Sequence, residues 1–282
     1  MNREEIGEFL YRFYRKRTSS FLANIYKASI TADSKDIHRA RLDVKNIFAL
    51  YGLFEMLDSA AFKENGGYKL FRPLYRQAGK IREIQVNYLL LSNPQPAGVE
   101  LPAFILWLNG EERQAVKRFL QLVKKFRDPE LAATEKRVQK ICSSSTIFKM
   151  RSKTLAYAKS RAMFVCELQS NEPGEKEIHK IRQHLKTMAM ITTIVYSIKP
   201  LKQLDVIISE LNKTEMMIGD WHDRVVLKDA IERFLAENSP DPKELNSLKR
   251  LIQELLDYNQ NLVQHFMPEV SRLVQSITED EN

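Results

Sequence analysis

The sequence predicts an all-α protein: two four-helix bundles of long antiparallel helices, related by a pseudo-twofold axis and joined in one compact domain. Apolar residues recur mostly at intervals of three and four positions, as in FLANIYKASI and LKRLIQELLDY, which is the period of an α-helix. Alternating runs typical of strands are scarce. Two motifs also recur in the same order in the two halves of the chain, which indicates duplication of a unit of about four helices.

Short breaks divide the apolar pattern into nine helices. TADSK follows the first helix, ENGG precedes the third, SNPQPAGVELP precedes the fourth and SNEPGE precedes the seventh. SIKPL places a proline near the start of the eighth helix, and NSPD supplies an N-cap and a proline before the ninth. The predicted helices span residues 3–30, 35–58, 67–92, 102–127, 130–142, 146–170, 175–197, 199–236 and 241–277.

The duplication rests on two pairs of matching segments. DIHRARLDVKNI (36–47) matches EIHKIRQHLKTM (177–188), and AGKIREIQV (78–86) matches IGDWHDRVV (218–226). The two segments of the first pair are separated along the chain by only one residue more than the two segments of the second pair. Because the two motifs keep their order and spacing, we predict one domain with an internal repeat. The predicted repeats are residues 1–142 and 143–282.

Composition excludes several classes of protein. The chain of 282 residues is 44% hydrophobic, which is sufficient for a sizeable core, yet no stretch approaches the roughly 20 apolar residues of a membrane span. The start MNREEIGEFLYRFYRKR lacks the pattern of a signal peptide. Cys142 and Cys166 provide neither a metal motif nor a disulfide framework. We therefore expect a cytoplasmic protein that contacts no membrane and holds no metal or cofactor.

The positive charge is unevenly distributed. Residues 1–141 contain 25 Lys and Arg against 16 Asp and Glu, a net charge of +9, whereas the remainder has 19 against 20, or −1, which together give the formal net charge of +8. This asymmetry favours a placed basic surface for an anionic partner. A solvated charged face is the alternative reading of the same count.

Each repeat places a histidine, an arginine and a lysine on one side of a helix. Positions i, i+3 and i+7 fall within a narrow arc of the helix surface, because they lie close to whole turns apart. Partly buried cations without partners lose solvation and repel one another, so we expect them to need an anion. Acids on neighbouring helices, such as Glu83 or Asp223, are the alternative partners. The two stripes are His38, Arg41, Lys45 and His179, Arg182, Lys186. The residues expected on the opposite, solvent-facing side are Arg39, Asp43, Lys180 and Gln183.

At these residues the sequence resembles the CHAD family, the "conserved histidine α-helical domain". That family's repeat has a His-x-x-Arg-x-x-x-Arg/Lys helix and, further along the chain, a Leu-Gly-x-x-Arg/His-Asp segment. The first repeat has the helix motif from His38, followed by GKIRE from Gly79; the second has it from His179, followed by GDWHD from Gly219. The resemblance covers nearly the whole chain. The family's additional arginines are absent, so the binding surface is expected to be less basic than usual; Asn46, Ala49, Thr187 and Met190 stand in their places.

The resemblance implies two four-helix bundles around a basic central cavity that binds inorganic polyphosphate without catalysis, and association with polyphosphate granules. Arginine forks and spaced cations suit a flexible, evenly charged phosphate chain. Matching residue by residue, the resemblance places eight side chains in that cavity: His38, Arg41, Lys45, Arg82, His179, Arg182, Lys186 and His222. Further candidate cations, whose alternative is a solvated surface position, are Arg72 and Arg76 before Arg82, and Arg12 and Lys153 at equivalent places of the two repeats.

Two enzymatic alternatives fit the motifs less well. The WHD tripeptide at 221–223 resembles the His-Asp pair of metal-dependent HD phosphohydrolases, which need further ligands converging on a metal. Its equivalent in the first repeat is Arg82-Glu83, and arginine is not a normal ligand. Helical phosphotransfer domains carry His-x-x-Lys-Gly, but the glycine is missing here, since Leu42 and Gln183 take its place.

Nucleic-acid binding is the main alternative among binding functions. A net charge of +8 fits a protein that binds a phosphate backbone. The sequence contains no recognition-helix motif, and most aromatic residues have core spacing. Tyr68, Tyr75 and Tyr88 are candidates for stacking on bases. A scaffold without a ligand is the remaining alternative, if the missing arginines have abolished binding.

Overall fold

The computed structural model describes residues 3–59, 62, 66–92, 100–126, 128–169, 173–200 and 202–279. Regular secondary structure in these ranges is entirely α-helical, which confirms the predicted all-α class. The nine helices of the described ranges correspond one to one to those predicted, with ends that differ by a few residues at most. They are α1 Arg3–Thr31, α2 Ser34–Leu57, α3 Gly66–Ser92, α4 Pro102–Lys125, α5 Asp128–Ser144, α6 Ile147–Gln169, α7 Glu175–Ile198, α8 Lys202–Glu237 and α9 Pro242–Glu279.

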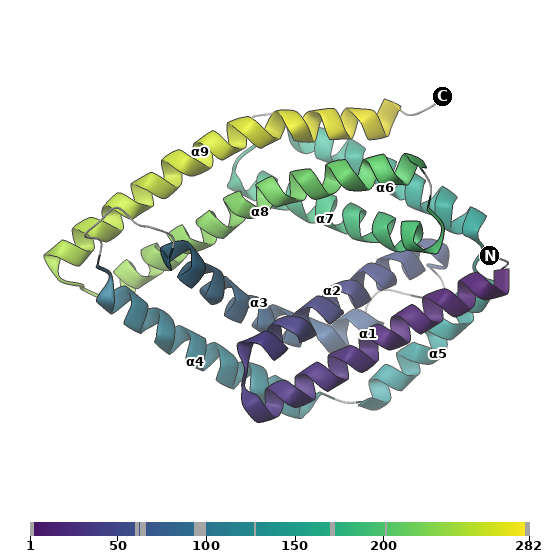
Figure 1. The fold of residues 1–282 in the computed structure, drawn as a ribbon, viewed down its shortest axis with the longest axis horizontal. Coiled ribbons are helices and arrows are strands. Elements are labelled where there is room, and N and C mark those ends of the chain that lie inside the picture. Colours follow the sequence, from purple (N-terminus) through teal and green to yellow (C-terminus); the bar gives the residue numbers. More distant parts are fainter. Residues whose placement is uncertain are drawn as a thin grey trace.

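The helices form two groups that follow the order of the chain (Figure 1). Helices α1 to α5 make the first group, in which α2 packs against α1 and α3, and α5 packs against α1. Helices α6 to α9 make the second, with α8 packed against both α7 and α9. The groups meet where α2 contacts α6 and α7, and where α3 and α4 contact α8. The pseudo-twofold relation between them stays a prediction from the sequence repeat.

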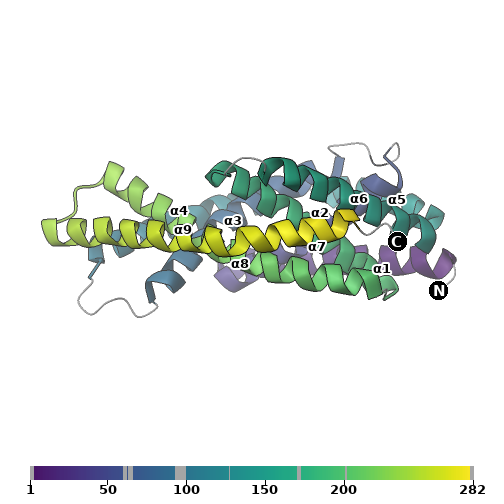
Figure 2. The ribbon, with the colours of Figure 1, turned by 90° about the horizontal axis from the view of Figure 1, so that it is seen from above.

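The molecule is elongated (Figure 2), and most of its long helices are inclined to the long axis (Figure 1). The beginning of α1 and the end of α9 lie towards the same end of that axis, and the beginning of α9 lies at the other. None of the helices in the described ranges combines the length and apolar character that crossing a bilayer requires.

Helix α7 ties the two groups together because it contributes to both hydrophobic cores. Its first half places Ile181 and Leu185 in the core formed with α6, α8 and α9. Its second half places Ile191 and Val195 in the core that α1 to α5 form together with parts of α8 and α9. All four side chains are 0–1% exposed. Burying each such side chain contributes about 1.5–3 kcal/mol, so α7 is held firmly beside α2.

Side-chain capping defines where several helices begin. The Asp33 carboxylate accepts a hydrogen bond from the Lys35 backbone N–H (2.7 Å) at the start of α2. Asp241 caps α9 in the same way, 2.9 Å from the Lys243 nitrogen, with Pro242 as the first helical residue. The break NSPDPKE therefore ends α8 and starts α9, as the sequence indicated.

The expectation that Asp43 faces solvent is wrong. Its side chain is only 4% exposed because α1 covers that side of α2. The carboxylate accepts hydrogen bonds from the Ser20 hydroxyl (2.7 Å) and the Asn24 amide (2.9 Å), and lies 3.6 Å from Arg17 Nη1. The three other residues of the expected solvent side are exposed: Arg39, Lys180 and Gln183.

Candidate anion-binding site

Helices α2 and α3 of the first group and α7 and α8 of the second line a cavity of about 280 Å³. We name it the basic cavity, because five of its lining side chains are arginine or lysine. Segments far apart in the sequence thus meet at one place. The lining residues are His38, Arg41, Leu42, Lys45, Tyr75, Gly79, Arg82, Glu83, Val86, Arg182, Lys186, His222, Asp223 and Val226.

The helical period places the cations at the edge of the packed face. Ile37, Ala40 and Val44 of α2 are 0–1% exposed, and each directly precedes a residue of the first stripe. On α7, the buried Ile181 and Leu185 precede the arginine and lysine of the second stripe. Successive residues are separated by slightly more than a quarter of a turn around the helix, so a residue that follows a buried one lies beside the core. Each stripe of cations therefore borders the core.

Seven of the predicted site residues line the basic cavity: His38, Arg41, Lys45, Arg82, Arg182, Lys186 and His222. The other five lie elsewhere. His179 packs beside His222, and Arg72 lines an adjoining cavity. Arg76 and Lys153 are exposed on α3 and α6. Arg12 is exposed on α1, where its guanidinium lies 3.5 Å from Glu8.

Arg41 is held over α3 by an aromatic ring. Its guanidinium carbon lies 4.3 Å from the centre of the Tyr75 ring, a cation–π arrangement. Gly79 lies next to the guanidinium, and a Cβ there would meet it at 3.8 Å, an ordinary van der Waals distance. The Tyr75 ring thus supports one face of the planar group, whose N–H donors around its edge suit an anion.

Lys45 and Lys186 share a single carboxylate. Their Nζ atoms lie 3.8 Å and 3.9 Å from the same oxygen, Oε1 of Glu215 on α8. Burial, followed by the charges of Arg182 and Lys45, lowers the pKa of Lys186 to about 8, although Glu215 opposes the shift. One carboxylate is therefore too little negative charge for the cations gathered around it.

Arg182 and His38 have buried nitrogen atoms without partners. Within the described residues, neither Nε of Arg182 nor Nδ1 of His38 has a hydrogen-bond partner. Burial lowers the pKa of Arg182, and the nearby carboxylates of Asp223 and Glu215 oppose this. Burial and the charge of Arg82 lower the pKa of His38. An anion entering the cavity would favour the charged form of each group.

His179 lies outside the lining because its ring packs against Trp221 and His222, with centroid separations of 5.2 Å to each. Its Nε2 atom is 3.9 Å from Glu175. Burial and then the neighbouring His222 lower the pKa of His179. His222 itself lies 3.3 Å from its neighbour Asp223. Within the described ranges, no group of three or more His, Cys, Asp or Glu side chains is placed to hold a metal ion.

The acid that contacts both lysines, Glu215, was not predicted from the sequence; the predicted partners, Glu83 and Asp223, line the cavity. The repeat contains a signal that points to Glu215. When the second motifs are aligned, its equivalent in the first repeat is Tyr75, which lines the cavity and supports Arg41. Both residues stand four positions before the glycine of the second motif, one turn earlier on the same helix face.

A second cavity, of about 730 Å³, adjoins the basic cavity. We name it the aromatic cavity; α2, α3, α6 and α7 line it. The two cavities share three lining residues, Lys45, Tyr75 and Lys186. The remaining residues that line it are Phe48, Ala49, Gly52, Glu55, Met56, Tyr68, Arg72, Tyr157, Arg161, Gln183, Thr187 and Met190.

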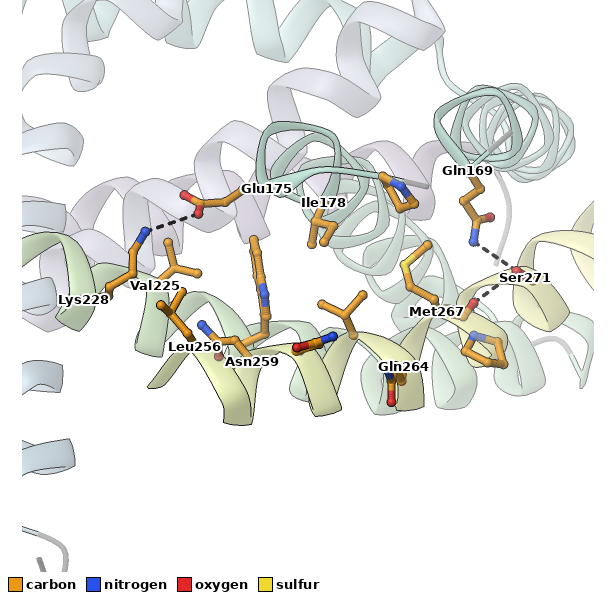
Figure 3. Close-up of a pocket in the computed structure, with 15 residues that line it drawn as sticks. Gln169, Glu175, Ile178, Val225, Lys228, Leu256, Asn259, Gln264, Met267 and Ser271 are labelled. Atoms are coloured by element: carbon orange, nitrogen blue, oxygen red, sulfur yellow. Dashed lines mark hydrogen bonds and ion pairs between the residues drawn. The ribbon is translucent and has the colours of Figure 1, made fainter. Parts of the chain in front are cut away.

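A third cavity, of about 920 Å³, lies within the second group of helices and differs in chemistry (Figure 3). Apolar side chains such as Ile178 and Val225 and amides such as Asn259 line it. Its single lysine, Lys228, lies 3.6 Å from Glu175. The positive charge is thus neutralised, and this cavity does not suit a polyanion.

Comparison with solved structures identifies the fold. The chain superimposes on the crystal structure of the CHAD domain from the plant Ricinus communis with a TM-score of 0.70. The two sequences are 14% identical, and the match covers 98% of this chain and 92% of that one. No family model and no curated protein matches the sequence. The chain therefore has a CHAD-like fold.

Proposed function

From the CHAD-like fold and the basic cavity, we propose that this protein binds inorganic polyphosphate and acts as a binding protein, not as an enzyme. The observation that carries the proposal is the meeting of equivalent cations from both repeats. Arg41 and Lys45 of α2 and the matching Arg182 and Lys186 of α7 line one cavity, although they belong to opposite halves of the chain. We further propose that the protein acts in the cytoplasm, at polyphosphate granules.

The chemistry of the cavity supports this ligand. A phosphoanhydride chain presents evenly spaced oxygens and no base or apolar group, so its receptor needs several cations and charge-assisted hydrogen bonds. Nε of Arg182 and Nδ1 of His38 are buried and have no hydrogen-bond partner among the residues that the structure describes, and such oxygens would satisfy them. The excess of cations over carboxylates around Lys186 would be relieved by the same ligand.

The shape of the site favours polyphosphate over duplex nucleic acid. The cations lie between four helices in a cavity of about 280 Å³, not on an open face that a double helix could lie against. A double helix is recognised through grooves about 6–12 Å wide that admit protein elements, which is the reverse of this geometry. Single-stranded DNA is the remaining polyanion to compare.

A competition experiment tests the proposal. Long-chain polyphosphate should displace a labelled single strand of DNA of equal total charge, and the reverse displacement should need a large excess. Both ligands must be measured at the same salt concentration, because phosphate binding falls steeply as salt rises. Equal preference for the two polyanions would overturn the proposal.

Two quadruple variants with equal loss of charge make the test specific to the cavity. Replacing Arg41, Lys45, Arg182 and Lys186 by alanine should weaken polyphosphate binding by orders of magnitude while the protein stays folded. The matched control replaces four exposed cations by alanine: Arg12, Arg76, Lys153 and Lys180. The control should bind nearly as the wild type does. Wild-type affinity in the cavity variant would rule out the basic cavity as the site.

A further inference from the structure

The aromatic cavity is lined by aromatic and other apolar side chains, and a phosphate chain alone has no group suited to them. Phe48, Tyr68 and Tyr75 form one side of it, with ring centroids 5.1 Å and 5.3 Å apart along the series Tyr68, Phe48, Tyr75. Tyr157 of α6 lines the cavity as well. The methionines Met56 and Met190 add further apolar surface. Inorganic polyphosphate has no group that gains from contact with these rings.

Positively charged side chains also line the region where the basic cavity and the aromatic cavity join. Lys45 and Lys186 line both, and Tyr75 is the third shared residue. Arg161 covers the Tyr157 ring, with its guanidinium carbon 4.9 Å from the ring centre. Within the described residues, the buried Nε of Arg161 has no hydrogen-bond partner. The junction thus offers two lysines beside the Tyr75 ring, and the aromatic cavity beyond it holds a further cation, Arg161, against the Tyr157 ring.

We propose that the aromatic cavity binds the base of a nucleoside oligophosphate whose phosphates occupy the basic cavity. The inference rests on the proposed function, since it uses the same cations for the phosphates. The shared residues Lys45 and Lys186 contact the phosphates nearest the sugar, and the base stacks on the tyrosine rings beyond them. The volume of about 730 Å³ lies in the range of small-molecule sites.

Polar groups on α7 complete the site. The Gln183 side chain carries both a donor and an acceptor, and the Thr187 hydroxyl, which donates to the Gln183 carbonyl (2.9 Å), retains acceptor capacity. Thr187 directly follows Lys186, and Gln183 lies three positions before Lys186. These groups are suited to the hydrogen-bonding edge of a base, which a phosphate chain lacks.

Calorimetry with ATP, GTP, UTP and inorganic tripolyphosphate, each alone and without divalent ions, tests the inference. The four ligands carry similar charge, so an advantage of a nucleotide reports the nucleoside, and the Tyr157 variants below assign that advantage to the base. At least one nucleotide should bind roughly 10-fold or more tightly than tripolyphosphate, as expected for one base stacked on an aromatic ring. Tripolyphosphate affinity equal to or above that of all three nucleotides would overturn the inference and leave the proposed function intact. If no ligand binds, including long-chain polyphosphate, both fail.

Variants of Tyr157 locate the effect, because this residue lines the aromatic cavity and not the basic cavity. Tyr157→Leu should bring the nucleotide preference to within about twofold while tripolyphosphate affinity stays the same, and Tyr157→Phe should retain the preference. Tyr88→Leu is the matched control, since Tyr88 hydrogen-bonds Asn109 (2.8 Å) and lines neither cavity. Thr187→Trp fills the cavity from α7 and should act like Tyr157→Leu. Full nucleotide preference in both Tyr157→Leu and Thr187→Trp would exclude this cavity.

Discussion

Lys45 and Lys186, equivalent residues of the two repeats, both contact the same oxygen of Glu215, at 3.8 Å and 3.9 Å. Their helices, α2 and α7, belong to different groups, so this carboxylate links the two halves of the basic cavity from α8. If a polyanion binds in the basic cavity as proposed, we expect it to compete with Glu215 for the two lysines.

Removing this internal competitor should strengthen binding. Glu215→Gln keeps the shape of the side chain and leaves two cations without a carboxylate, so affinity for polyphosphate should rise by about 10-fold. Titration calorimetry at constant salt measures the change. The exposed Glu254, which pairs with Arg250 on α9, supplies the control, and Glu254→Gln should leave affinity unaltered. A loss of affinity in Glu215→Gln would show that the carboxylate organises the lysines and does not oppose the ligand.

The pKa of Lys186, lowered to about 8, predicts a pH dependence of binding. In the free protein Lys186 loses its proton as pH rises through that value, whereas a bound polyanion favours the charged form and raises the pKa. Binding should therefore take up protons near pH 8, and affinity should fall by several-fold between pH 7 and pH 9. Calorimetry in buffers of different ionisation enthalpy detects the uptake. Proton-independent binding across this range would contradict the prediction.

The same shift predicts an effect on stability. Because the pKa of Lys186 is lower in the folded than in the unfolded protein, the unfolded chain binds more protons between about pH 8 and the ordinary lysine value, and the free energy of unfolding should rise with pH in that window. Lys186→Met removes the buried charge and should raise stability at pH 7 by about 1 kcal/mol. Urea unfolding at pH 7 and pH 9 measures both effects. Equal curves for the variant and the wild type at pH 7 would refute this.

His38 and His179, the equivalent histidines of the two repeats, should differ in how much they contribute to polyphosphate binding. His38 lines the basic cavity, and its buried Nδ1 has no partner in the described part of the chain, whereas His179 packs against Trp221. His38→Ala removes one hydrogen bond to the ligand and should weaken polyphosphate binding about 5-fold at pH 6.5. His179→Ala should change the affinity less than twofold. Equal losses in the two variants would mean that the ligand reaches beyond the cavity lining.

The helical fold was predictable because its signals are local. The apolar period and the turn-forming breaks mark all nine helices of the described ranges. The burial of Asp43 was not predictable, because the helical period of α2 does not indicate which helix covers the side of α2 on which Asp43 lies. Burial of Asp43 depends on α1, whose Ser20 and Asn24 donate to the carboxylate. That relation exists only in the tertiary structure.

The lining of the basic cavity was predictable to the extent that the repeat is symmetric. Arg41 and Arg182 occupy equivalent positions and line one cavity, and the binding of polyphosphate there stays a proposal. His179 departs from this pattern because Trp221 stands where the first repeat has Ile81, and the larger ring packs on the imidazole. The motif predicts which residues lie on the same face of a helix. It does not predict which of them a neighbouring side chain covers and which of them line the cavity.

A tertiary cap at the beginning of α4 provides a test of the fold itself. Leu101 at the N-cap position has no side-chain cap, and the carboxylate of Glu244 on α9 takes that role. Its oxygens accept hydrogen bonds from the backbone N–H groups of Phe104 (2.8 Å) and Ala103 (3.2 Å), and the residue is 2% exposed. Because the carboxylate also lies at the positive end of the helix dipole, both effects stabilise the contact between the two groups of helices.

Glu244→Ala should lower the free energy of unfolding by about 2 kcal/mol, since it removes the acceptor of one buried backbone donor, Phe104 N–H, and of one partly buried donor, Ala103 N–H. Glu244→Gln should lose about half as much, because the amide oxygen still accepts one of the two bonds while the charge is gone. Glu254→Ala on the exposed side of α9 is the matched control and should cost less than about 0.5 kcal/mol. Urea unfolding followed by circular dichroism measures all three. If Glu244→Ala is no more destabilising than the control, α4 does not depend on α9 for its cap.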